Sequence, residues 1–231
     1  MYRVSVVHLS EGLSMGLALE VGILADLKKQ DAEGFAYYKK EFAVLNRVLA
    51  SVGLPAHAEP EELEELFSCS MFGYSGLHYL RRIGAHLALS RTIPPPGNKD
   101  AANDPILARD YWNRFSAGER LKYQHLIIHG DAEGFYVPVD FERALVVTGI
   151  PLIGGMLGST QQLQSECRDL ATVLEVPAGM DGEADELHEA IGAHWRGQEK
   201  WRQYAIETFT CLQLLAACDA SLRTKAAIVF C

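Results

Sequence analysis

The residues best suited to chemistry lie in a short segment rich in histidine and carboxylate. His125, His129 and Asp131 are separated by four and two positions, and Glu133 and Tyr136 follow closely. In a strand the first three would project from one face, because side chains alternate. Imidazole and carboxylate groups can bind a divalent ion or transfer protons near neutral pH. A turn in which the aspartate caps backbone groups explains the same pattern.

A second polar group precedes it. Ser75, His78, Arg82 and His86 are spaced by three, four and four positions. On a helix over residues 74–89 they fall within an arc of roughly 80°. A solvated helix face accounts for such a stripe. The alternative is that the stripe lines a cleft, where an arginine can hold an anion through bidentate contacts.

One hypothesis unites the two groups in a ligand-binding or catalytic cleft. The cleft would be formed by the 75–86 helix and a hairpin over 125–136, beneath a proline-rich loop at 91–105. His129 would act as acid or base, Asp131 would orient it, and Arg82 would contact an anion. No HExxH motif is present, so we predict neither a metal nor another cofactor. The candidate ligand-site residues are Ser75, His78, Arg82, His125, His129, Asp131, Glu133 and Tyr136.

Two glycine-rich motifs have simpler explanations. Residues 73–76 (GYSG) resemble a nucleophile elbow, but leucine occupies the fifth position, so Ser75 is better interpreted as a helix N-cap. Residues 154–160 (GGMLGST) lack both GxGxxG and a Walker lysine. They predict a bend followed by a helix that Ser159 caps.

The periodicities predict an α+β fold that is predominantly α-helical and forms a single compact domain over residues 1–231. The helix over residues 201–218 is apolar on most of its circumference, which is typical of a central helix. Further helices are expected around residues 17–27, 35–52, 61–67, 74–89, 159–174 and 182–192. A small β element is expected from short strands near residues 2–9, 124–129, 135–137 and 226–230.

The net charge and the cysteine content indicate which partners and which cellular location to expect. The net charge of −9 disfavours a nucleic-acid binder and an anionic membrane surface as partner. Acidic clusters at 59–65 and 181–189 are either solvated helix starts or a lure for a basic partner. Five cysteines without a CxxC motif indicate reduced thiols. No signal peptide or apolar run near ~20 residues is apparent, so a cytoplasmic location is expected.

Three segments carry a resemblance to a family. Residues 74–82 (YSGLHYLRR), 129–141 (HGDAEGFYVPVDF) and 155–160 (GMLGST) resemble an uncharacterised family of soluble proteins from bacteria and plants. The likeness spans roughly residues 10–220. It implies a cytosolic domain that stands alone, and it transfers no catalytic residue.

Three function classes therefore remain. The leading hypothesis is a cytosolic non-catalytic binding or regulatory protein, such as an acidic immunity-type inhibitor that binds a basic protein. The alternative is a small-ligand-binding protein or enzyme that uses the cleft described above, with a small anionic ligand. The third is an oligomeric scaffold, in which Trp195, Trp201 and Tyr204 would form a seam between subunits, although such aromatics usually pack within a domain.

Overall fold

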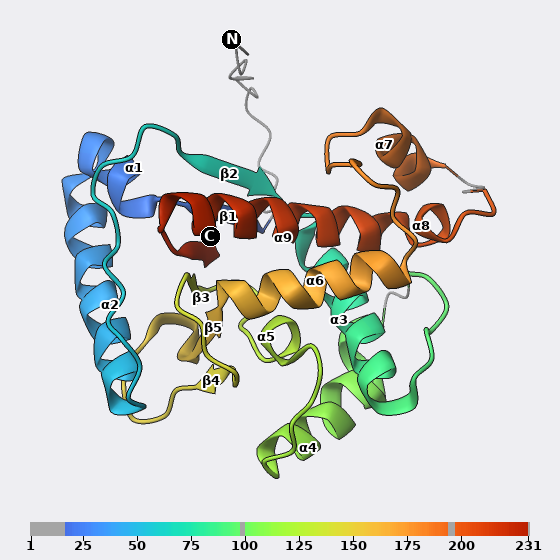
Figure 1. Ribbon diagram of the computed structural model, residues 1–231, viewed down its shortest axis with the longest axis horizontal. Coiled ribbons are helices and arrows are strands. Elements are labelled where there is room, and N and C mark those ends of the chain that lie inside the picture. Colours follow the sequence, from blue (N-terminus) through green and yellow to red (C-terminus); the bar gives the residue numbers. More distant parts are fainter. Residues whose placement is uncertain (1–16, 98–99, 194–196, 231) are drawn as a thin grey trace.

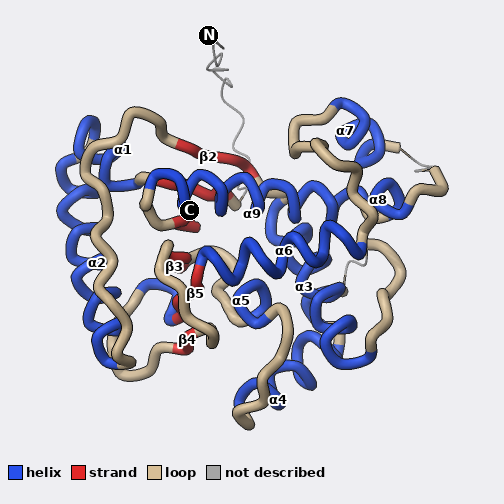
Figure 2. The backbone as a smooth tube through the Cα atoms, viewed as in Figure 1, coloured by secondary structure: helices blue, strands red, loops and turns tan. Residues whose placement is uncertain are grey.

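A six-stranded mixed sheet lies at the centre of the computed structural model, which describes residues 17–97, 100–193 and 197–230 (Figures 1 and 2). The strand order is β2-β1-β6-β3-β5-β4, with β3 and β5 parallel and the other neighbours antiparallel. Strands β2 and β4 are therefore the two edges. The strands are β1 (Ala18–Val21), β2 (Phe67–Ser70), β3 (Gly134–Val137), β4 (Leu145–Val146), β5 (Met156–Ser159) and β6 (Ile228–Phe230).

Helices cover both faces of this sheet, and the alternation of β6 shows how. Ile228 and Phe230 join the larger core, which contains residues of α3, α6 and α9, whereas Val229 joins the core beneath α1 and α2. The helices are α1 (Ile23–Gln30), α2 (Ala32–Ser51), α3 (Gly73–Ser90), α4 (Trp112–Ser116), α5 (Gln124–Ile127), α6 (Thr160–Val173), α7 (Asp185–Gly192), α8 (Lys200–Gln203) and α9 (Ala205–Thr224). A π-helical segment, Ile106–Tyr111, leads into α4.

Helix α9 is the central helix that the sequence predicted. It packs against α6, α3, α7 and the β1-β2 side of the sheet. Among the described helices it alone has the length and hydropathy of a membrane-spanning segment, although no such segment was predicted from the sequence. Its most apolar window is 78% buried inside the protein, so packing within the fold accounts for its composition.

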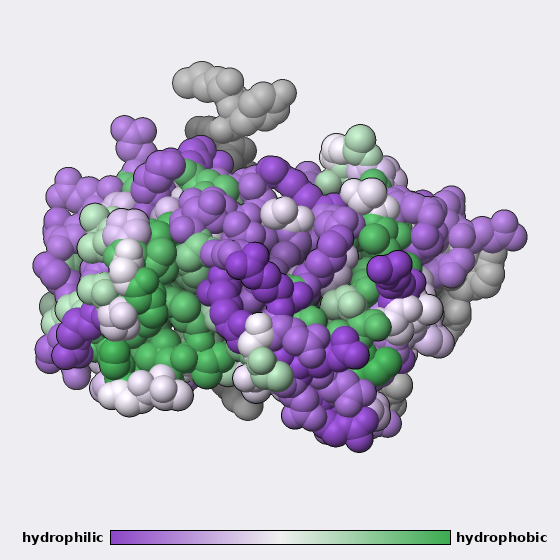
Figure 3. Space-filling view, turned by 60° about the horizontal axis from the view of Figure 1, so that its bottom comes forward, coloured by the Kyte–Doolittle hydropathy of each residue, from purple (hydrophilic) through white to green (hydrophobic). Residues whose placement is uncertain are grey.

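The core beneath α1 and α2 reaches the surface on one side of the protein. Side chains of Tyr38, Leu54, Val147 and Ile150 are partly buried against it, and Val146 of the edge strand β4 is 44% exposed. Figure 3 shows apolar surface in this region, between α2 and the β4 end of the sheet.

The α+β class is confirmed, and two of the four predicted strands are found. Strands β3 and β6 match the predictions near 135–137 and 226–230, whereas residues 2–9 lie outside the described part. The strand predicted near 124–129 is wrong, because residues 124–127 form helix α5. Leu126, Ile127 and Ile128 are buried on all sides. A short apolar run of this kind does not distinguish helix from strand by periodicity.

Two of the predicted helices and one of the two predicted N-caps are also corrected. The helix expected over 17–27 begins at Ile23, because Gly22 adopts a left-handed φ of 93° after strand β1. The acidic helix expected over 61–67 is absent, and Phe67 instead begins β2. Ser75 does not cap α3, whose N-cap is Phe72. Ser159 does cap α6, through a 3.4 Å bond from the Gln162 amide.

The close contact of β3 with β5 gives a stability prediction. Gly158 pairs with Tyr136, and a Cβ at position 158 would lie 2.2 Å from Tyr136 Cδ1. Gly158→Ala should lower the free energy of unfolding by about 2 kcal/mol or more, because the buried ring has no room to move. Urea unfolding followed by circular dichroism measures this change.

Gly192→Ala is the matched control, since a Cβ at position 192 would have no atom within 4 Å and the φ of this glycine is ordinary. It should change stability by less than about 1 kcal/mol. Equal stabilities for the two variants would contradict the packing described here.

Candidate functional site

Arg81 holds the segment of residues 126–131 against α3. Its Nε donates to Leu126 O at 2.8 Å, and its Nη2 donates to His129 O at 3.0 Å and Gly130 O at 3.1 Å. Its Nη1 pairs with the Asp131 carboxylate. The guanidinium therefore satisfies carbonyls in the last turn of α5 and just after it, where a cation is favoured. Arg81 was not among the candidate site residues predicted from the sequence.

Asp131 and His78 lie beside this arginine at the surface. His78 Nε2 is 3.4 Å from Asp131 Oδ2, and the Asp131 side chain is 48% exposed. The hydrogen bond from His78 and the charge of Arg81 lower the pKa of Asp131 to about 2. The two side chains line a hollow of about 330 Å³ together with Trp112. The structure thus places the 75–86 helix next to 129–131, while any chemistry there stays a prediction.

His129 is buried behind this hollow. Its ring stacks on Tyr136 with centroids 4.0 Å apart, and Nε2 lies 3.2 Å from Phe135 O. Burial and the nearby Arg81 lower the pKa of His129 to about 3. The ring is therefore neutral at physiological pH and packs as part of the core.

His125 is buried on the other side of the same segment. Its Nδ1 accepts a hydrogen bond from the Ser159 amide at 3.0 Å, so Nε2 carries the proton and donates to Glu142 O at 3.2 Å. Burial lowers its pKa to about 4. Both ring nitrogens are occupied by protein groups. Within the described residues, no cluster of three or more histidine, cysteine, aspartate or glutamate side chains could hold a metal ion.

Glu166 explains why residues 124–127 form a helix. From α6, its carboxylate accepts hydrogen bonds from the amides of His125 at 3.1 Å and Leu126 at 2.8 Å, which are free donors at a helix start. Burial raises the pKa of Glu166 to about 8. Tyr136 donates from its hydroxyl to His125 O at 2.8 Å. Spacing within the sequence gave no signal for Glu166, because it lies about 40 residues from the groups it binds.

Arg82 faces a different part of the protein. Its Nε donates to Asp104 at 2.7 Å and its Nη1 to Pro95 O at 3.0 Å, and His86 contacts the same aspartate at 3.1 Å. Arg82 therefore fastens the proline-rich 91–105 segment to α3 instead of facing His129. Ser75 and Glu133 are exposed. The predicted 125–136 hairpin is wrong, because helix α5 and a turn precede the single strand β3.

Most carboxylates of the acidic cluster at 59–65 have partners within the fold. Glu59 is 1% exposed and accepts hydrogen bonds from His57 at 2.6 Å and the Ala227 amide at 2.7 Å. Glu61 pairs with Lys39 of α2 at 2.7 Å, and Glu62 pairs with Lys28 of α1 at 2.9 Å. Glu65 pairs with Arg223 at 3.1 Å. Four of the five carboxylates thus have partners within the fold, whereas the exposed Glu64 forms no ion pair with a described residue.

The cluster at 181–189 differs in this respect, and we call it the α7 acidic surface. Leu187 and Ala190 turn inward toward α8 and α9, and the carboxylates face solvent. The sequence has no lysine or arginine between Arg168 and Arg196. None of the five carboxylates forms an ion pair with any described residue. The exposed members are Asp181, Glu183, Asp185, Glu186 and Glu189.

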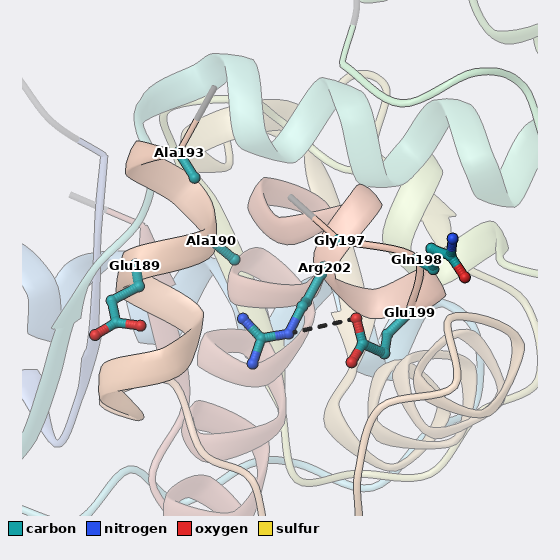
Figure 4. Close-up of a pocket in the computed structure, with 7 residues that line it drawn as sticks. All are labelled: Glu189, Ala190, Ala193, Gly197, Gln198, Glu199 and Arg202. Carbon is teal, nitrogen blue, oxygen red and sulfur yellow. Dashed lines mark ion pairs between the residues drawn. The ribbon is translucent and has the colours of Figure 1, made fainter. Parts of the chain in front are cut away.

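A cavity of about 520 Å³ adjoins this surface between α7 and α8 (Figure 4). Glu189 points away from Arg202, whose Nε lies 3.6 Å from Glu199. Ala193 and Gly197 also line the cavity, and residues 194–196 lie outside the described part of the chain.

The two buried histidines predict an acid-sensitive stability. Each ring is neutral in the folded protein and takes up a proton below about pH 6.5 when unfolded. Unfolding therefore binds protons between about pH 6.5 and pH 4, and the free energy of unfolding falls on acidification by up to about 1.4 kcal/mol per pH unit for each ring.

Urea unfolding at half-unit steps of pH tests this slope. His125→Asn keeps an acceptor for the Ser159 amide and should reduce the slope by about 1.4 kcal/mol per pH unit, although it lowers stability at pH 7. His129→Gln should do the same. Slopes equal to that of the unmodified protein would show that neither ring is held neutral.

A comparison with protein families identifies the family of this chain. Residues 15–230 match the family described as "Putative DNA-mimic protein". No curated protein and no solved structure matches the chain. The match covers the three segments that carried the resemblance to an uncharacterised family. The chain belongs to this family of putative DNA-mimic proteins.

Proposed function

We propose that the protein binds a DNA-binding protein in place of DNA, and that the α7 acidic surface occupies the part of that partner which otherwise contacts phosphates. The family assignment and the net charge of −9 support this function. The observation that carries it is the group of five exposed carboxylates without a cation partner among the described residues.

The family corrects the partner class expected from the sequence. An unspecified basic protein or a small anionic ligand was expected, whereas a DNA mimic is recognised by proteins that bind DNA. Such proteins bind phosphates through clustered lysine and arginine side chains. Nucleic acid itself is still not the proposed partner, because like charges repel.

The geometry of α7 suits this role. Asp185 and Glu189 are one helical turn apart, which places their Cβ atoms about 5–6 Å from each other on one face. Cations of a partner would not have to displace a lysine or arginine of the described residues from these carboxylates. Other exposed carboxylates, such as Glu62 and Glu142, already pair with cations.

Binding of this kind does not require catalysis. His125, His129 and Tyr136 are buried and bonded within the fold, which supports a structural role for them.

We propose a cytoplasmic location, because Cys69, Cys167, Cys211 and Cys218 are free thiols.

A DNA-displacement experiment tests the function. DNA-binding proteins of the source organism are loaded on immobilised double-stranded DNA, and the purified protein is applied at low salt. We expect it to elute a DNA-binding protein that mass spectrometry identifies. With purified components, the same pair should show competition between the protein and DNA that weakens as salt rises.

The triple variant Asp185→Asn, Glu186→Gln, Glu189→Gln should weaken that competition by about tenfold or more, because it removes three unpaired charges. The matched control is Glu62→Gln, Glu142→Gln, Asp219→Asn, whose carboxylates pair internally. Both variants change the net charge from −9 to −6. Equal losses would contradict the role of α7, and no eluted DNA-binding protein would contradict the function.

A further inference from the structure

Strand β2 forms an open edge of the sheet beside the α7 acidic surface. It pairs only with β1 among the described residues. Ser68 and Ser70 are exposed, while Phe67 and Cys69 pack against the larger core. An edge strand presents backbone donors and acceptors to which another strand can add.

The register shows which backbone groups face outward. The Met71 amide donates to Leu17 O at 2.8 Å, so residues 17 and 71 form a hydrogen-bonded antiparallel pair. Such pairs alternate along a ladder. Cys69 and Phe67 therefore bond to β1, whereas the N–H and C=O groups of Ser68 and Ser70 point to the free edge.

Apolar side chains flank both ends of this edge. Leu66 precedes β2 and is 43% exposed, and Phe72 and Tyr74 follow it at 40% and 44%. They account for three of the six exposed large apolar side chains in the described residues. Exposed apolar groups that gather around unpaired backbone mark a surface for binding.

The charge near this edge is negative. Gly182 packs on Gln213, where a Cβ at position 182 would lie 3.0 Å from the amide group, and Cys69 Sγ donates to Gln213 O at 4.0 Å. The α7 acidic surface therefore begins next to β2. Burial and the Glu183 carboxylate raise the pKa of the Cys69 thiol to about 12.

A small cavity completes the surface at the start of β2. It has a volume of about 150 Å³ and is lined by Val21, Asp26, Leu66 and Phe67 among others. Apolar walls beneath a carboxylate suit the stem and charged end of a lysine or arginine side chain.

We propose that the free edge of β2 binds an extended, basic segment of the partner as an added strand. This inference rests on the proposed function and names the element of the DNA-binding protein that is recognised: a lysine- or arginine-rich arm. Backbone groups of Ser68 and Ser70 bond to the arm. Its basic side chains lie near Asp26 at one end and near Asp181 and Glu183 at the other.

Two variants at one position separate backbone pairing from other effects. Ser68→Pro removes an outward N–H without removing a bond to β1, and proline is tolerated on edge strands. Ser68→Thr keeps the N–H and is the matched control. The probe is a short peptide in which lysine alternates with valine and threonine, and the same peptide with glutamate in place of lysine is its control.

Fluorescence anisotropy of the labelled peptide measures affinity, and hydrogen exchange measures protection of the Ser68 and Ser70 amides. We expect the lysine peptide to bind and to protect both amides. Ser68→Pro should weaken binding by about fivefold or more and Ser68→Thr should not. Asp181→Asn with Glu183→Gln should weaken binding of the lysine peptide, and the glutamate peptide should not bind.

Binding that Ser68→Pro leaves unchanged would overturn the proposal. Protection of both amides in the free protein, whether by residues 1–16 or by a second copy, would overturn it as well. The outcome is separable from that of the proposed function. If Ser68→Pro displaces a DNA-binding protein as well as the unmodified protein does, strand addition at β2 is refuted and the proposed function stands. If the peptide binds to β2 but the protein does not compete with DNA, the proposed function is refuted and strand addition stands.

Discussion

The burial of α9 is the constraint on which the rest of the structure depends. A 20-residue helix that is apolar on nearly all sides must be covered on nearly all sides. Helix α9 is covered by helices α3, α6 and α7 and by strands β1, β2 and β6. The segment at 182 and strand β2 meet because both pack on Gln213 of this helix.

The protein treats its two acidic clusters in opposite ways. At 59–65, His57, two lysines and Arg223 pair with four of the five carboxylates and hold the segment to α1, α2, α9 and the residue before β6. At 181–189, the positive end of the α7 dipole stabilises the carboxylates of Asp185 and Glu186, which lie in the first turn of that helix. That arrangement permits a helix to form while its carboxylates stay open to solvent. Sequence composition alone does not distinguish the clusters, because both have five acids within nine residues or fewer.

Strong periodicity made the long elements predictable, and distant contacts decided the rest. Helices over 35–52 and 74–89 follow from regular apolar spacing, and strands near 135–137 and 226–230 follow from their β-branched and aromatic content. The helix predicted over 201–218 is found only in part, because Tyr204 separates α8 from α9 and α9 continues to Thr224. The site was harder. Adjacent arginines of α3 face different segments: Arg81 binds the carbonyls of 126–130, and Arg82 binds Asp104. Nothing in their spacing decides between them. The bonding of His125 depends on Ser159 and Glu142, which are remote in the sequence.

An open edge strand normally invites pairing between copies of the same chain. Here the charges beside β2 oppose that outcome, because an antiparallel second copy would bring its Asp26 toward Asp181 and Glu183 of the first copy, and its Asp181 and Glu183 toward Asp26. Like charges that face one another across strands are destabilising. A basic segment meets the opposite condition, since its lysine or arginine side chains gain carboxylates that form no ion pair with a described residue. The acidic residues of the proposed site for a DNA-binding partner would therefore also keep the edge available for it, which links the α7 acidic surface and strand β2 in one proposed recognition site.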